Sequence, residues 1–327
     1  MKHLTILVPR GEGNNLSSIV GAYKIFSRAN EYWKSKHTKE VFKVQLAGVT
    51  RKVQFYNGLF SVQPHAKIAE IRKTDLIVIP SLNHNYETSV KRNRLMIDWI
   101  NAQYCKGAEV ASICTGAFLL ASSGLLDGKS CSTHWSAADD LRTKFPEIEI
   151  KMDKVITDEN GIYTNGGAYS FLNLVIYLIE KFYDRETAIY CAKVFQIEMD
   201  RKSQLSFVIF NGQKQHGDDL VKKAQEYIER HPHEKISIED LSSKLSVGRR
   251  NFDRRFIKAT GDTPLEYSQR VKIESAKRAL ENSLKTVHEV MYAVGYSDPK
   301  AFRGVFRKIT GLSPMEYRNK YSKGVSA

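Results

Sequence analysis

Short apolar runs alternate with helix-like stretches along the first two thirds of the chain. Apolar runs of strand length stand at 4–8, 41–49, 76–80, 109–114 and 161–164, and stretches with helical spacing of apolar residues lie at 19–33, 92–104, 117–123 and 170–182. Near-continuous apolar strands separated by helices are typical of a mostly parallel sheet. The pattern therefore predicts an α/β domain over residues 1–210.

From residue 218 onward the strand-like runs stop, and signals for helix starts follow one another. These signals are Ser237, Thr263-Pro264, Thr286, Asp298-Pro299 and Ser313-Pro314. Ser, Thr and Asp side chains accept hydrogen bonds from the first free amides of a helix, and proline suits its first turn. The polar stretch 211–217, with its two glycines, predicts a linker. We therefore expect a second, all-α domain over residues 218–327.

The helical part repeats itself at an offset of 50 residues, since 252–267 and 302–317 are identical at eight positions. The identical pairs are Phe252/Phe302, Phe256/Phe306, Lys258/Lys308, Thr260/Thr310, Gly261/Gly311, Pro264/Pro314, Glu266/Glu316 and Tyr267/Tyr317. In each copy the phenylalanines lie on one helical face, the glycine ends that helix, and a capping box starts the next one. A repeated segment of this kind indicates a repeated supersecondary unit.

Each phenylalanine helix follows a shorter apolar helix, at 238–245 or 287–294, after a short break. Helix, short break and helix is the helix-turn-helix arrangement, so the all-α domain is expected to hold two such units. A helix from Pro264 to about Asn282 joins them, and at ~1.5 Å per residue it spans roughly 28 Å. Because adjacent major-groove segments on one face of DNA lie about 34 Å apart, the two units could enter successive grooves.

The charge of the chain points to an anionic partner. Lys and Arg total 50 against 36 Asp and Glu, a formal charge of +14. Residues 1–213 carry +6 and the 114 residues after them carry +8, which more than doubles the charge density in the helical part. Nucleic acid is the commonest partner of such a surface. For base contacts we predict Arg249, Arg250, Asn251, Lys300 and Arg303, and for phosphate contacts Arg254, Lys258, Arg307 and Lys308.

Residues 218–322 resemble the DNA-binding domain of the AraC/XylS family. The resemblance rests on Gly295-Tyr-Ser-Asp298, Phe302, Phe306, Lys308, Thr310-Gly311, Ser313-Pro314 and Tyr317-Arg318. One departure is Gly248, where that family commonly has a helix-capping serine. The resemblance implies a sequence-specific transcription regulator that binds double-stranded DNA, with RNA polymerase as a further candidate partner.

Cys114 stands where a predicted strand ends and a helix begins. Small residues after it, among them Gly116, permit a tight strand-to-helix turn. A helix N-terminus can lower the pKa of a thiol and supply amides that bind an oxyanion. His134 follows twenty residues later, and a cysteine and histidine brought together by the fold are a candidate nucleophile and base. Cys114, His134 and Gly116 are therefore the candidate pocket.

Residues 3–207 resemble the PfpI-like branch of the class I glutamine amidotransferase-like superfamily. The matching segments are 114–121, 124–128, Thr133-His134-Trp135, Thr164-Asn-Gly-Gly167 and Ser203-Gln204 with Phe207. The resemblance implies a flavodoxin-like α/β sandwich with Cys114 at the elbow. Such a domain fused to AraC-type repeats is an architecture found in transcription regulators.

The same resemblance bears on catalysis, because enzymatic relatives place an acidic residue near the first strand. Ser17 or Ser18 takes that place here, and Glu12 is out of register. We therefore expect a domain that is not an enzyme, and that senses a small molecule or mediates dimerisation, changing DNA affinity by population shift. One alternative is a cysteine-dependent hydrolase, amidase or lyase using Cys114 and His134. Another is an architectural DNA binder that responds to no metabolite.

Four cysteines without a CxxC pair favour neither a disulfide scaffold nor a zinc site, and they indicate a reducing, cytoplasmic location. The longest uncharged stretch, 160–179, contains glycines and asparagines, so no membrane span is expected. His231 and His233 lack a third ligand, and we predict no metal and no cofactor. Relatives of the N-terminal part often dimerise, which makes a homodimer the expected assembly.

Overall fold

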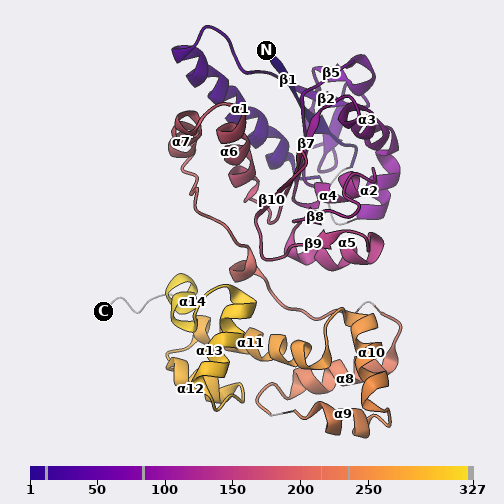
Figure 1. Cartoon of the computed structure of the whole chain (residues 1–327), viewed down its shortest axis with the longest axis vertical. Coiled ribbons are helices and arrows are strands. Elements are labelled where there is room, and N and C mark those ends of the chain that lie inside the picture. The colour runs from indigo at the N-terminus through magenta and orange to yellow at the C-terminus, as the bar shows by residue number, and fades with distance from the viewer. Residues whose placement is uncertain (12–13, 83–84, 215, 235, 323–327) are drawn as a thin grey trace. The chain divides into compact units, whose positions relative to one another are not determined.

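The computed structural model of the chain describes residues 1–11, 14–82, 85–214, 216–234 and 236–322. These residues form two compact units, Met1–Gln204 and Leu205–Ala327, here called the N-terminal and C-terminal units (Figure 1). Among the described helices, none combines the length and the apolar composition needed to cross a bilayer.

A central sheet organises the N-terminal unit, with its strands in the order β10-β11-β7-β6-β1-β2-β5. They span Lys2–Val8 (β1), Phe42–Gly48 (β2), Ala66–Lys67 (β5), Leu76–Ile79 (β6), Glu109–Ile113 (β7), Ile156–Glu159 (β10) and Ile162–Asn165 (β11). Neighbours pair in parallel, except that β10 runs antiparallel to β11. The inner order β2-β1-β6-β7-β11 is that of a doubly wound, flavodoxin-like sheet. The predicted fold class of this unit is thereby confirmed.

Helices cover both faces of this sheet (Figure 1). One face holds α1 (Leu16–Lys36), α6 (Phe171–Phe182) and α7 (Arg185–Val194), and the other holds α2 (Tyr86–Arg92), α3 (Arg94–Tyr104), α4 (Ala117–Ala121) and α5 (Ala138–Lys144). Side chains alternate between the two resulting cores, as the pleat of a strand requires. In β1, for example, Leu4 and Ile6 enter the first core and Leu7 enters the second. All nine elements predicted in this part are present, with ends shifted by three residues or fewer.

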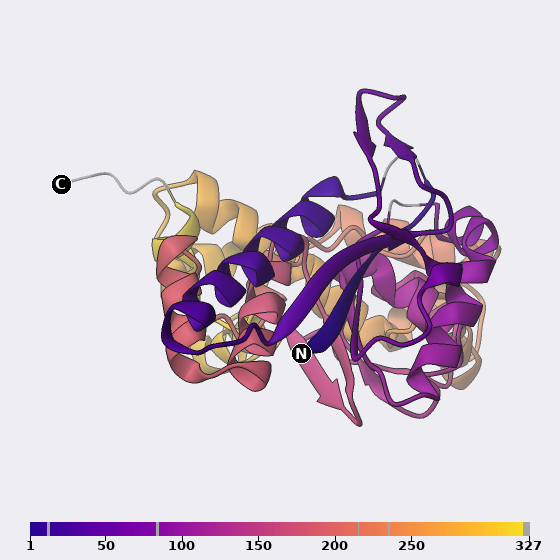
Figure 2. The same ribbon diagram turned by 90° about the horizontal axis from the view of Figure 1, so that it is seen from above.

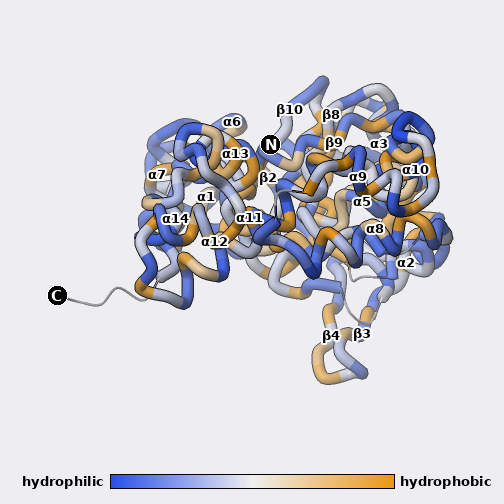
Figure 3. The backbone as a smooth tube through the Cα atoms, turned by 90° about the horizontal axis from the view of Figure 1, so that it is seen from below, coloured by the Kyte–Doolittle hydropathy of each residue, from blue (hydrophilic) through white to orange (hydrophobic). Residues whose placement is uncertain are grey.

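An unpredicted hairpin, β3 (Val53–Phe55) and β4 (Phe60–Val62), projects from the N-terminal unit (Figures 2 and 3). Tyr56 and Asn57 adopt positive φ values of 53° and 55° in its turn. The turn leaves Tyr56, Leu59 and Phe60 exposed. The hairpin thus presents apolar side chains to solvent.

A short parallel pair, β8 (Ser130–Cys131) and β9 (Glu149–Ile150), lies apart from the main sheet.

The C-terminal unit is helical, as predicted. Its helices are α8 (Asp219–Arg230), α9 (Ile238–Lys244), α10 (Arg249–Thr260), α11 (Pro264–Asn282), α12 (Val287–Ala293), α13 (Pro299–Thr310) and α14 (Pro314–Tyr321). One apolar core joins α8, α9 and α10 to the start of α11, and another joins the rest of α11 to α12, α13 and α14. Helices α9 and α10 form the first helix-turn-helix, and α12 and α13 form the second (Figure 1). The predicted joining helix has the bounds that the sequence indicated.

The repeat at offset 50 is also a repeat of contacts. The Thr260 hydroxyl donates to the carbonyl of Phe256 at 2.8 Å, and Thr310 repeats this bond to Phe306 at 2.9 Å. The glycines that follow have φ values of 76° and 73° in the left-handed region. Both predicted capping boxes are present, at the starts of α11 and α14. The duplicated sequence therefore folds into duplicated local structure.

Residues 205–210 belong to the C-terminal unit and not to the first domain, in which the sequence pattern had placed them. The Lys277 ammonium donates to the carbonyl of Val208 at 2.5 Å, and the amide of Phe210 donates to Glu274 at 3.2 Å. Residues of the expected linker 211–217 pack as well, since Gln225 on α8 donates to the Gln213 carbonyl at 2.7 Å. The structure thus places the division between the units at Gln204, because polar groups on α8 and α11 bind the segment that follows it.

Candidate functional site

Helix α10 buries its phenylalanine pair and exposes a basic face. Arg250, Asn251, Arg254 and Lys258 are exposed, and their spacing of three and four residues places them on one side of the helix. Arg254 donates to the side-chain oxygen of Asn251 at 3.1 Å. Within the described residues, the side chains of Arg250 and Lys258 make no hydrogen bond or ion pair. This face can therefore meet an anionic ligand without first breaking contacts at those two positions.

Helix α13 exposes the second basic face. Asp298 caps the helix by accepting from the amide of Lys300 at 2.8 Å. Lys300, Arg303, Arg307 and Lys308 are all exposed. Arg307 lies 3.6 Å from Glu316, while the side chains of Lys300 and Arg303 have no such partner among the described residues. Helix α10, by contrast, has Gly248 as its N-cap residue and therefore no side-chain cap.

Arg249 differs from the other residues predicted to contact bases, because two carboxylates of the protein already accept hydrogen bonds from its guanidinium. Its Nε donates to both carboxylate oxygens of Asp253 at 2.9 Å, and its Nη1 donates to Glu239 on α9. Arg255 is likewise engaged, in a two-pronged bond with Asp218 at 2.7 and 2.8 Å. Arg249 therefore links α10 to α9, a role that its place in the sequence did not indicate.

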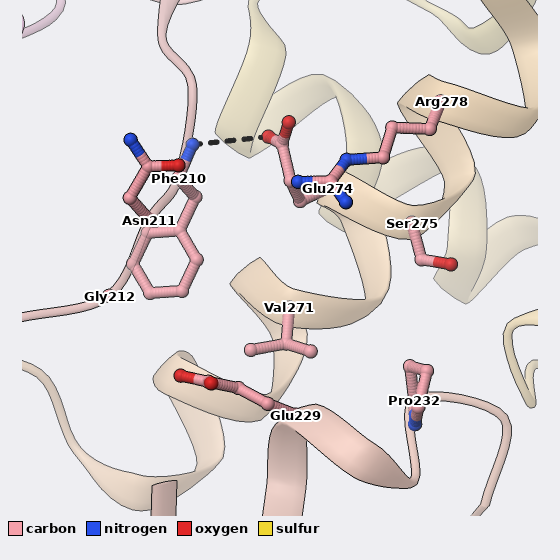
Figure 4. Close-up of a pocket in the computed structure, with 9 residues that line it drawn as sticks. All are labelled: Phe210, Asn211, Gly212, Glu229, Pro232, Val271, Glu274, Ser275 and Arg278. Atoms are coloured by element: carbon pink, nitrogen blue, oxygen red, sulfur yellow. Dashed lines mark hydrogen bonds between the residues drawn. The ribbon is translucent and has the colours of Figure 1, made fainter. Parts of the chain in front are cut away.

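A small cavity of about 300 Å³ lies beside the joining helix α11, between residues 210–212 and the end of α8. Figure 4 shows the Phe210 amide bonded to Glu274 at its edge, with Arg278 alongside. The sequence carried no signal for this cavity, since its walls come from three separate segments.

In the N-terminal unit, Cys114 follows β7 at a strained turn. Its φ of 54° lies in the left-handed region, which non-glycine residues seldom occupy. Gly116 makes the turn possible, because a Cβ there would stand 2.6 Å from the carbonyl oxygen of Pro80. The thiol is almost fully buried. The predicted strand-to-helix elbow is present, with glycine required by close packing against the end of β6.

A pocket of about 350 Å³ opens at this elbow. Its lining residues are Asn15, Ser17, Tyr56, Ser81, Leu82, Tyr86, Cys114, Thr115, His134, Ser136, Ala168 and Tyr169. Most of them follow the carboxyl ends of β1, β6, β7 and β11, Tyr56 comes from the projecting hairpin, and His134 and Ser136 follow β8. Ligand sites of doubly wound sheets lie at that edge. Cys114 and His134 both line this pocket, whereas Gly116 supports the turn and is not among the lining residues.

Family models match both units. Residues 5–181 match the model of the DJ-1/PfpI family, and residues 241–320 match a helix-turn-helix domain model. The chain belongs to the DJ-1/PfpI family. Both resemblances seen in the sequence are confirmed, that to the PfpI-like proteins by the first match and that to the AraC/XylS family by the helix-turn-helix match.

Relatives of this DJ-1/PfpI family chain include a curated protein named HTH-type transcriptional regulator GbdR, from Pseudomonas aeruginosa. The two are 24% identical, over 82% of this chain and 72% of the relative. A solved structure of a putative transcriptional regulator from Vibrio parahaemolyticus is 24% identical, with a TM-score of 0.53, covering 59% of this chain and 98% of the other. An AraC family transcriptional regulator from Pseudomonas putida is 15% identical, with a TM-score of 0.51, covering 60% of this chain and all of the other. Both structures have the same fold as the part of this chain that they cover.

The thiol of the DJ-1/PfpI-type elbow is not activated in the way the sequence suggested. Burial raises the pKa of Cys114, and this outweighs bonds from Ser81, from the Thr115 amide and side chain and from the His134 amide that favour the thiolate. The His134 Nδ1 accepts from the Ser136 amide at 3.2 Å and lies 2.7 Å from the Ser136 hydroxyl. The lowering that a helix N-terminus can give a thiol is thus outweighed here by desolvation.

Two serines follow β1 at this DJ-1/PfpI-type pocket, where the resemblance leads us to expect the place of the acidic residue. Ser17 lines the pocket, and the Ser18 hydroxyl donates to the Asn15 carbonyl at 2.7 Å and accepts from the Ser81 amide at 3.2 Å. None of the described residues that line the pocket is acidic. Glu12, the other candidate acid, lies outside the described residues.

Proposed function

We propose that this chain is a sequence-specific DNA-binding transcription regulator, with a DJ-1/PfpI-type domain that senses a small molecule. The observation that carries the proposal is the duplicated helix-turn-helix, in which α10 and α13 each expose a row of cationic side chains, two of them on each helix without a hydrogen bond or ion pair among the described residues. We call α10 and α13 the recognition helices. Relatives named as HTH-type transcriptional regulators support the same function.

The proposed DNA contacts divide by position along each recognition helix. Side chains near a helix N-terminus reach base edges in the major groove, and those further along meet phosphates. Base contacts are proposed for Arg250, Asn251, Lys300 and Arg303, and phosphate contacts for Arg254, Lys258, Arg307 and Lys308. Arg249 is left out of the base-reading set because Asp253 and Glu239 hold its guanidinium.

The pocket at Cys114 is the proposed effector site. Its hydroxyl, amide and aromatic lining suits a small molecule that hydrogen-bonds and stacks. A buried thiol with a raised pKa is a poor nucleophile, and no described lining residue is acidic. These two features favour sensing over the cysteine-dependent hydrolase, amidase or lyase.

We also propose that the regulator works as a homodimer, with RNA polymerase as its further partner at a promoter. The projecting β3–β4 hairpin supports dimerisation, because its tip exposes Tyr56, Leu59 and Phe60 together. Apolar patches of this kind commonly mark protein–protein contacts.

Selection from randomised duplexes with the full chain tests the function, followed by fluorescence anisotropy on the selected sequence. We expect one preferred sequence, with affinity falling steeply as salt rises because phosphate contacts release counterions. Binding without sequence preference would contradict the proposal. Effector sensing is tested separately by a thermal-shift screen of metabolites on the same protein, since a ligand of the native state raises its Tm.

A further inference from the structure

Among the described residues, the two helix-turn-helix units have separate apolar cores. The core of the first reaches α11 through Tyr267 and Val271, and the core of the second begins at Ile273. Lys272 lies between these positions and is only 8% exposed. Helix α11, the segment 205–213, which bonds to α14 and to α8, and the polar contact at this point therefore connect the two helix-turn-helix units.

Lys272 makes that contact. Its ammonium donates to the carbonyl of Glu234, in the loop that leads into α9, at 2.7 Å. It also donates to the carbonyl of Val294, at the end of α12, at 3.0 Å. One side chain on the joining helix thus bonds to the backbone of both helix-turn-helix units, through charge-assisted hydrogen bonds from a buried ammonium.

The backbones of the two units also approach each other closely beside this ammonium. Gly295 has a φ of 75°, and a Cβ there would stand 2.3 Å from the carbonyl oxygen of His233 and 2.7 Å from the Lys272 ammonium. Tyr296, the next residue, has its ring 5.7 Å from that ammonium. Residues 233–234 and 294–296 thus form a junction around Lys272, which we call the Lys272 junction.

We propose that Lys272 is a positioning residue that sets the spacing at which the two recognition helices meet DNA. The inference rests on the proposed function. A joining helix of ~28 Å that tilts by about 10° moves its far end by about 5 Å, more than the ~3.4 Å rise of one base pair. A joining helix alone would therefore tolerate a neighbouring spacing, whereas the junction holds one spacing.

The test measures tolerance of spacing with the full chain. The preferred duplex is first found by selection, and one or two base pairs are then inserted between the segments that the two recognition helices protect. For the wild-type chain we expect a single inserted base pair to weaken binding by about tenfold or more, because one unit loses its base contacts. For Lys272→Met we expect the same insertion to cost less than about threefold.

Lys277→Met is the matched control. Lys277 is another buried lysine of α11, but it binds Val208 and Glu274 and not the two units together. We expect this variant to keep the wild-type penalty for insertion, even where it lowers the Tm. A loss of folded protein lowers binding to every duplex equally, so it does not mimic a changed preference for spacing.

Two further variants protect the test if Lys272→Met does not fold. Lys272→Gln keeps a donor for one of the two carbonyls and should give an intermediate penalty. Gly295→Ala pushes the junction apart from its other side and should relax spacing as well. An unchanged insertion penalty in the folded Lys272 variants would overturn the inference while leaving the regulator intact. Failure of the selection itself would instead remove the proposed function on which the inference rests.

Discussion

Replacing Arg250 by alanine is the most direct test of base recognition. The side chain is exposed on α10 and makes no hydrogen bond or ion pair within the described residues. Surface substitutions without such partners usually change stability by less than about 0.5 kcal/mol. The effect should therefore fall on DNA binding, where loss of a base contact costs about 1–3 kcal/mol, or roughly 5- to 150-fold in Kd.

The assay is anisotropy on the selected duplex and on duplexes that carry each base substitution in turn. For Arg250→Ala we expect weaker binding together with lost discrimination at one base pair. Lys258→Ala is the matched control on the same helix, since the Lys258 side chain also makes no hydrogen bond or ion pair with the described residues. It should weaken binding to all duplexes alike and reduce the slope of log K against log salt by about 1.

Arg255→Ala provides the opposite pattern, because Arg255 binds Asp218 at the start of α8. It should lower the Tm and leave base discrimination intact. Full retention of both affinity and discrimination in Arg250→Ala would refute the assignment of this residue. A uniform loss across all duplexes would move Arg250 to the phosphate-binding set.

Three other outcomes are expected. Burial raises the pKa of Cys114, so iodoacetamide at pH 7.5 should label the exposed Cys105 before Cys114. Peptide mass spectrometry measures both rates, and faster labelling of Cys114 would contradict the burial of its thiol. The Arg255 guanidinium beside Asp218 holds the pKa of that carboxyl below its usual range; the resulting stability is present above an aspartate's ordinary pKa of about 3.9 and is lost as the pH falls through the lower folded-state value. Asp218→Asn should therefore flatten the decline of Tm between about pH 5 and pH 3, and an unchanged decline would refute this. Leu59→Asp at the hairpin tip should shift a dimer toward monomer in sedimentation, whereas Leu284→Asp, a control at an even more exposed leucine of the C-terminal unit, should not.

The helical repeat was the part of the fold that the sequence predicted best. The joining helix begins at Pro264 and ends at Asn282 as expected, because its start has a capping box whose partners are three residues apart. Signals of that kind are local, so they can be recognised without knowing the fold. The β3–β4 hairpin escaped prediction because each of its strands has three residues, too few to show an alternating pattern.

The candidate site was predicted by position but not by environment. Cys114 was located from the strand-to-helix pattern, yet the direction of its pKa shift depends on burial by distant segments. Arg249 looked like its neighbours, and only the fold brings Glu239 to its guanidinium. Lys272 gave no signal at all, since its carbonyl partners lie 38 and 22 residues away. A pattern of neighbouring residues cannot predict contacts between residues that are remote in the sequence.

The duplicated fold has a consequence for the direction of the DNA target. The two helix-turn-helix units share their buried residues, but the exposed positions differ at the offset of 50: Asn251 corresponds to Ala301, Asp253 to Arg303 and Arg254 to Gly304. Two helix-turn-helix units with the same buried residues but different exposed residues on their recognition helices recognise two different short sequences in a fixed order. The target of one chain therefore has a left and a right end, and inverting it would present each recognition helix with the wrong bases. Such a polarity would let a single bound chain face one of two divergent genes.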